Sequence, residues 1–209
     1  SVMDGGLDMV EYIYYMSLNY GGMEVFLADT TGKVNLLSGS QPQLDGLKLS
    51  ENGKKAAYLD TDANTGDTIL VEIELGKEKA ETVATNVQSF GYIGNTLIYY
   101  FDYTEGVGTL GAAGSKTTIA NASGVQFTED AVYYVADADA ATGNGELRAW
   151  DGKTETAIAK DVFAFQYKEN GKLVYIGKYD VNAGVGDLYY YDGKKARKLD
   201  TGITAIFIY

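Results

Sequence analysis

The chain has 209 residues, of which 45% are hydrophobic and 22% are charged, and this composition excludes a disordered chain. Its formal net charge of -12 disfavours nucleic acid and anionic membrane surfaces as partners. The absence of Cys and His excludes disulfides, Cys/His zinc sites, and catalysis by a Cys nucleophile or a His base.

Five Tyr-rich segments recur along the chain and predict five short β-strands, because Tyr, Val, Ile and Leu favour pleated, half-buried strands. These segments are YIYYM at 12–16, AAYLD at 56–60, LIYYFD at 97–102, VYYVAD at 132–137 and LVYIGKYD at 173–180. Their alignment places five tyrosines in register: Tyr14, Tyr58, Tyr99, Tyr133 and Tyr175. The intervals between them run from 34 to 44 residues, which is the period of a propeller blade.

Each Tyr-rich strand is followed by a loop and by three further predicted strands. The next strands are EVFLADTTG, TILVEIELG, GTLGAAGS, ELRAWDG and DLYYYDG, and most of them end in a Gly-Lys turn. The strands after these are KVNLLS, AETVAT, TTIANA, ETAIAK and ARKLD. The last strands of the repeat are LKLSENG, FGYIGN, VQFTED, FAFQYKENG and ITAIFIY. Four antiparallel strands per repeat, with no helical periodicity, predict an all-β fold.

We therefore predict a five-bladed β-propeller with four-stranded antiparallel blades of about 40 residues. The strands of a blade are named A to D from the inside outward, and the Tyr-rich strand is B. The first repeat lacks an A strand and the C-terminus supplies a spare one, so we expect the C-terminal strand to join the first blade and close the ring. The predicted parts are a lead-in at 1–10 and one propeller domain at 11–209, with blades at 11–43 plus 201–209, 44–86, 87–124, 125–161 and 162–200.

The repeat resembles that of the TolB-like bacterial propellers. The segments that carry the resemblance are SENGKKAAYLD at 50–60, KENGKLVYI at 168–176 and DLYYYDGKKARKL at 187–199. The likeness covers residues 11–209, although the Ser-Pro-Asp-Gly turn usual in these repeats is missing. Such propellers are mostly interaction modules and some belong to peptidases. The resemblance implies a bacterial extracellular or cell-surface protein.

The loops between the B and C strands are the longest connections, and loops on a rigid scaffold carry most binding sites. We therefore expect any site at the end of the propeller that carries the B–C and D–A connections. The candidate contact residues are Tyr20, Tyr103, Tyr179 and Trp150, since Tyr and Trp give contact area at little entropic cost. The predicted function is a non-catalytic binding or scaffolding module, a monomer with a protein or glycan ligand.

Two alternatives remain open. The run of Asp60, Asp62, Asn64 and Asp67 approaches a calcium-loop pattern and predicts weak calcium binding, although Asp, Asn and Gly are also ordinary turn formers. No other cofactor is expected. A glycosidase-like enzyme would need two carboxylates across a pocket. The acids near the channel-lining strands are Asp45, Asp161 and Asp200, and these are too few for us to expect an enzyme. No apolar run approaches the roughly 20 residues of a membrane-spanning helix, so we expect no membrane insertion.

Overall fold

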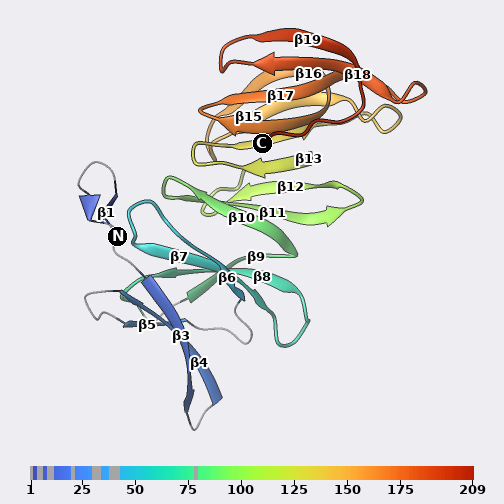
Figure 1. Cartoon of the computed structure of the whole chain (residues 1–209). Helices are drawn as coiled ribbons and strands as arrows, with labels where there is room; N and C mark the ends of the chain where they lie inside the picture. Colours follow the sequence, from blue (N-terminus) through green and yellow to red (C-terminus); the bar gives the residue numbers. More distant parts are fainter. Residues whose placement is uncertain are drawn as a thin grey trace. The chain divides into compact units, whose positions relative to one another are not determined.

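A computed structural model describes residues 2–3, 7–8, 12–19, 22–29, 34–37, 43–77 and 80–209, with side chains from 26–28, 46–77 and 80–209. Contacts divide the chain into two compact units, residues 1–87 and 88–209. All regular structure in the described residues is antiparallel β-sheet, as predicted (Figure 1). No described helix is long and apolar enough to span a membrane. A single domain over 11–209 stays a prediction.

The described residues of the first unit form three small sheets. Two of them are β1–β2 (Val2–Met3, Leu7–Asp8) and β3–β4–β5 (Tyr12–Asn19, Gly22–Asp29, Val34–Leu37). The third is the four-stranded sheet β6–β7–β8–β9 (Gln43–Leu49, Lys55–Thr61, Thr68–Glu74, Ala80–Thr85). In this sheet Tyr58 is fully buried and pairs with Val71.

The second unit is built on a sheet whose ten strands pair in chain order. They are β10 (Val87–Ile93), β11 (Thr96–Thr104), β12 (Val107–Ala112), β13 (Thr118–Phe127), β14 (Val132–Ala136), β15 (Gly145–Trp150), β16 (Glu155–Glu169), β17 (Lys172–Asp180), β18 (Val185–Tyr191) and β19 (Ala196–Ile203). The meander follows the predicted A-B-C-D order through three repeats, with β11, β14 and β17 as the Tyr-rich B strands.

The core of this unit lies on both faces of β14, all five residues of which are buried. Successive side chains of a strand point to opposite faces. Tyr134 therefore packs with Ile98, Leu110 and Trp150 in one cluster, while Tyr133 packs with Phe165 and Tyr175 in the other. This explains the Tyr-Tyr pair of the B strand, because each tyrosine faces a different neighbouring repeat.

Strands β13 and β16 each serve two repeats. The sequence predicts separate D and A strands, but in the structure one long strand pairs with β15 through its first half and with β17 through its second half. The bend in β16 falls at Asp161, whose φ is 55°. Asp tolerates this left-handed conformation better than most residues. The predicted blade boundaries at 124/125 and 161/162 thus lie inside strands.

The predicted C-terminal strand ITAIFIY is not confirmed. Only Ile203 belongs to a strand, and residues 204–209 form none. Ile203 and Ile206 are only partly buried, whereas Val162 and Phe165, at the equivalent positions of β16, are buried, and Phe207 is 81% exposed. The described sheets are open, and neither the five-blade count nor ring closure is confirmed.

Candidate functional site

Three B–C loops share one turn geometry. In each, the backbone carbonyl of an Asp accepts a hydrogen bond from a Gly N–H four residues later, and the Asp carboxylate accepts one or two further backbone N–H bonds. The three pairs are Asp62 with Gly66, Asp139 with Gly143, and Asp180 with Gly184. The hydrogen bonds from the Thr142 and Ala141 amides lower the pKa of Asp139, and those from Thr65 and Asn64 lower the pKa of Asp62.

The predicted calcium ligands are part of this turn system. Asp62 Oδ1 accepts hydrogen bonds from the amides of Asn64 and Thr65, at 2.8 and 3.0 Å. Asp60 is 1% exposed and its Oδ1 accepts the Thr61 amide, whereas Asn64 and Asp67 are exposed. Within the described part of the chain, no group of three or more acidic residues could hold a metal ion. Turn formation accounts for the positions of these carboxylates, and calcium binding stays a prediction.

Bulges at the ends of two B strands set the direction of two predicted contact tyrosines. The register shifts between Phe101 and Thr104 in β11, and between Gly177 and Asp180 in β17. Each bulge contains a residue in the left-handed region, Asp102 and Lys178, directly before Tyr103 and Tyr179. Bulges re-aim side chains that regular alternation would send elsewhere.

Tyr179 stacks on Phe163, and the two rings form an aromatic platform. Their centroids lie 3.8 Å apart and their planes differ by 7°. Phe163 comes from the A half of β16 and is 36% exposed, while Tyr179 ends the B strand β17 and is half-buried. The platform therefore lies at the B–C/D–A end of the second unit, where the sequence predicts a site.

The loop of the preceding repeat supports this platform. Asn144 Nδ2 donates to the Tyr179 carbonyl at 2.9 Å, and Asn144 Oδ1 accepts the Tyr179 N–H at 3.1 Å. Gly143 lies against the Phe163 ring, since a Cβ there would come 3.0 Å from its Cε2 atom. One amide thus holds both backbone groups of Tyr179, so the platform is fixed before any ligand arrives.

The remaining predicted contact residues are not gathered at the platform. Tyr103 is 47% exposed and makes an edge contact with Tyr100 at 5.8 Å. Trp150 is 2% exposed and packs in the core at the other end of its strand, next to the β15–β16 turn. Tyr20 lies outside the described residues.

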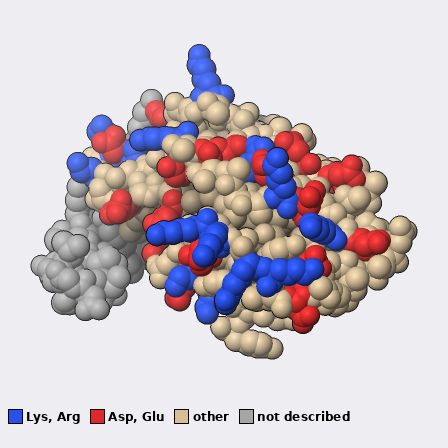
Figure 2. All heavy atoms as spheres, turned by 90° about the horizontal axis from the view of Figure 1, so that it is seen from above, with Lys and Arg blue, Asp and Glu red and all other residues tan. Residues whose placement is uncertain are grey.

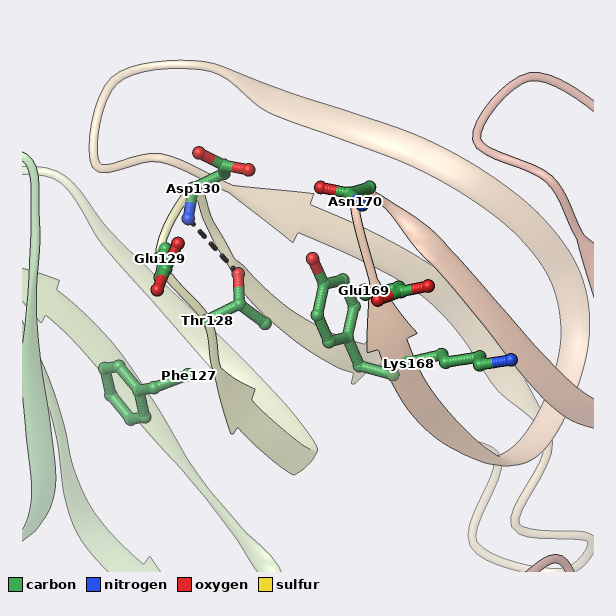
Figure 3. Close-up of a pocket in the computed structure, with 8 residues that line it drawn as sticks. Phe127, Thr128, Glu129, Asp130, Lys168, Glu169 and Asn170 are labelled. Carbon is green, nitrogen blue, oxygen red and sulfur yellow. Dashed lines mark hydrogen bonds between the residues drawn. The ribbon is translucent and has the colours of Figure 1, made fainter. Parts of the chain in front are cut away.

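A hollow of about 340 Å³ lies at the opposite, A–B turn end of the second unit. One wall is the β13–β14 turn, with Thr128, Glu129 and Asp130, and the facing wall carries Glu169 and Asn170 (Figure 3). Further lining residues are Phe127, Tyr167 and Lys168. The Asp130 amide donates to the Thr128 hydroxyl at 3.3 Å, so the acidic turn is held by its own hydrogen bonds.

Gln126 ties the two walls of this hollow together. Its Nε2 donates to the Phe165 carbonyl at 3.0 Å, and its Oε1 accepts the Tyr167 N–H at 3.0 Å. This arrangement mirrors that of Asn144 at the other end. Two amide side chains therefore link the same pair of repeats at both ends of their strands.

The acids of the enzyme alternative are not brought together as a described pair. Asp161 occupies the bend of β16, and Asp200 Oδ1 accepts the Thr201 amide at 2.8 Å. The side chain of Asp45 lies outside the described residues. Acidic and basic side chains are interspersed on the face seen in Figure 2, which fits a net charge that serves solubility.

Comparison with known proteins supports the fold alone. No protein-family model matches the sequence, and no curated protein matches it. The structure is similar to the β-propeller domain of the Trilobed protease from Pyrococcus furiosus, with 14% identity and a TM-score of 0.50 over 90% of this chain and 68% of that one. It is also similar to an acylaminoacyl peptidase, with 12% identity and a TM-score of 0.51, where it spans 88% of this chain but 37% of the peptidase. The chain thus covers about a third of that peptidase.

TolB from Acinetobacter baumannii is also a structural neighbour, with 13% identity and a TM-score of 0.42 over 91% of this chain and 52% of TolB. The neighbours therefore include TolB and other β-propellers, as the repeat predicts.

Proposed function

We propose that the chain is a non-catalytic binding module that takes a protein or glycan ligand through the B–C/D–A end of its second unit. The stacked pair of Phe163 and Tyr179 carries the proposal, because it is a flat aromatic surface that is partly open to solvent. Aromatic side chains dominate interface energetics and lose little entropy on binding.

Rigidity adds to this argument. Asn144 holds the backbone of Tyr179, and Gly143 leaves room for Phe163. A contact surface that is fixed in advance does not lose further conformational entropy on binding. Catalysis has less support, since the described acids Asp161 and Asp200 are engaged in backbone geometry and turn hydrogen bonds.

The test is a binding screen followed by a matched set of variants. Glycans, peptidoglycan fragments and extracellular proteins would be screened by thermal shift, because a ligand of the folded state raises the melting temperature. For any ligand found, we expect Phe163→Ala with Tyr179→Ala to weaken affinity at least 10-fold, as for interface residues that contribute about 2 kcal/mol.

The control is Leu199→Ala, which removes an apolar side chain that is 49% exposed on β19, away from the platform. Its affinity should equal that of the unmodified chain, and all variants should melt near the same temperature. Unchanged affinity in the double variant would disprove the role of the platform.

We further propose that the complete fold is a ring of five blades closed by residues 203–209. The support is that the described part of the first blade is short of one strand and the C-terminal segment has the pattern of that missing strand. The described sheet β3–β4–β5 has three strands where the sheet β6–β9 has four, and residues 204–209 continue the A-strand pattern without a described partner strand.

A further inference from the structure

A second hollow, of about 370 Å³, lies beside the single tryptophan of the chain. It opens at the turn end of the second unit, at the far end of the strands from the aromatic platform. Its walls come from the start of β11, the β12–β13 turn and the β15–β16 turn. The lining residues are Thr96, Ala112, Ala113, Gly114, Ser115, Thr117, Trp150, Gly152 and Lys153.

At the wall of this hollow one repeat has a small residue where the next two have large aromatic ones. Ala112 faces Ile98 across the sheet, in the register position that Trp150 occupies opposite Val132. In the last repeat this position is Tyr190, opposite Val174. The volume of the hollow is within the range of small-molecule sites.

Trp150 presents an unused hydrogen-bond donor here. The residue is 98% buried, because its exposed fraction is 2%. Its indole N–H has no hydrogen-bond partner among the described residues, and Nε1 is not one of the fully enclosed polar atoms. The little surface that Trp150 retains thus includes this donor, and the residue lines the hollow. A ligand that accepts a hydrogen bond in the hollow would replace the water that this accessible donor otherwise binds.

The charge of the hollow is opposite to that of the whole chain. Lys153 lines it, and among the described lining residues none is acidic, although the chain carries 29 Asp and Glu. The Lys153 ammonium forms no salt bridge with a described carboxylate. The nearest acid in sequence, Asp151, accepts the amides of Thr154 and Lys153 at 2.7 and 2.8 Å, and these bonds, together with the weaker effect of the Lys153 charge, lower its pKa. The site therefore offers an N–H donor, a cation and the hydroxyls of Thr96, Ser115 and Thr117.

We propose that this hollow binds the C-terminal carboxylate of a peptide whose last residue is small and apolar. The carboxylate accepts the Trp150 N–H and pairs with Lys153, and charge-assisted bonds of this kind are the stronger ones in proteins. Ala112, Ala113 and Gly152 leave room beside it for a methyl-sized side chain but offer no polar group to a larger one. The site is independent of the proposed platform, so either can fail without the other.

The single tryptophan makes the test direct, since fluorescence excited at the indole reports on this hollow alone. N-acetyl-alanine is the probe, and N-acetyl-alanine amide is its neutral match. We expect a saturable change in Trp150 emission with the acid, and at least 10-fold weaker binding of the amide. Glucuronate tests whether any small carboxylate suffices, and binding as tight as that of N-acetyl-alanine would overturn the assignment to peptides.

Two variants, with one control, test the two groups that are proposed to bind the carboxylate. Lys153→Gln should weaken binding of N-acetyl-alanine at least 10-fold, while Lys194→Gln, which alters the corresponding Gly-Lys turn after β18, should leave it unchanged. Trp150→Phe keeps an aromatic side chain and removes the donor, so calorimetry should show weaker binding; the smaller ring leaves a cavity in the core, so the melting temperature should fall, and binding is therefore measured well below it. The proposal is overturned by the absence of any saturable change with N-acetyl-alanine, by equal binding of its amide, or by full affinity in Lys153→Gln.

Discussion

Single residues with unusual backbone angles place most of the side chains that matter here. Asp102, Lys178 and Asp161 all have φ near 50°, and each lies within a bulge or a bend of its strand. Without the turn at Lys178, Tyr179 would follow the regular alternation of β17 and would not reach Phe163. The positions of Tyr103 and Tyr179 at the strand ends were predictable from the repeat. The directions of these two side chains depend on the backbone φ angles, which cannot be predicted from residue type.

The buried tyrosines predict how stability depends on pH. Burial raises the pKa of Tyr100 to about 12, and the neighbouring Tyr103 adds to the rise. An unfolded tyrosine ionises near pH 10. Between these values the unfolded chain has lost a proton that the native chain keeps, so the free energy of unfolding falls as pH rises. We expect a constant contribution below pH 10 and a loss from about pH 10 to 12.

Urea denaturation at several alkaline pH values measures this loss, with tyrosinate absorbance as the parallel readout. Tyr100→Phe removes the hydroxyl that donates to the Ala122 carbonyl at 2.7 Å, so it lowers stability at neutral pH. It should also make the alkaline decline shallower. An unchanged decline in Tyr100→Phe would contradict the prediction.

At the scale of the strand, the sequence predicts which segments form strands, and in what order, better than it predicts where one strand continues into the next. The strands of the second unit match the predicted segments because alternating apolar residues and Gly turns are local signals. The fusion of D and A segments into β13 and β16 was missed, because a bend at Asp161 looks in sequence like a loop. Phe163 was missed for the same reason, because the sequence places it at the start of a separate A strand and gives no sign that it stacks on Tyr179.

Long-range contacts explain the remaining failures. Asn144 holds Tyr179 from 35 positions away, and nothing near Asn144 indicates that partner. Trp150 is predicted as a contact residue because Trp gives contact area at little entropic cost. In the structure its side chain faces the preceding repeat, where Ala112 leaves space, and it is buried.

The bend of β16 yields a prediction of its own. Asp161 holds a φ of 55°, which glycine adopts without strain and a β-branched residue adopts at a cost. We expect Asp161→Gly to leave stability unchanged or raise it by up to about 1 kcal/mol, and Asp161→Val to lower it by about 1–3 kcal/mol. Urea denaturation measures both. Lys160→Val, at the exposed preceding position, is the control and should change little.

At the scale of the whole molecule, proposed ring closure makes residues 203–209 the A strand of the first blade. The register of β16 with β17 gives the expected pairing. Gln166 faces Val174 there, and the equivalent positions of the repeat are Phe207 and Ile13. We therefore expect Phe207 to face Ile13 across an antiparallel pair.

The absence of native cysteine makes this pairing testable by one engineered disulfide. In the variant Ile13→Cys with Phe207→Cys, mild oxidation should give an intramolecular disulfide in a monomeric chain. An unstrained bond should raise the free energy of unfolding by about 2–4 kcal/mol, and the melting temperature should rise with it. Ile13→Cys with Leu199→Cys is the control and should not cross-link within the chain. Dimers alone, or free thiols in the first variant, would argue against closure.

The shared strands β13 and β16 also bear on how such a chain could gain or lose a repeat. A crossover placed between two blades would cut through a strand that belongs to both, and would leave each product with half of a hydrogen-bonded ladder. Exchange at the B–C loops, by contrast, keeps every strand whole, and the Asp-to-Gly turns at Asp62, Asp139 and Asp180 have the same geometry. The unit that can be exchanged without cutting a strand therefore runs from one B–C loop to the next, and does not coincide with a blade. Chimeric chains joined at these loops should fold, whereas chains joined at the predicted blade boundaries should not.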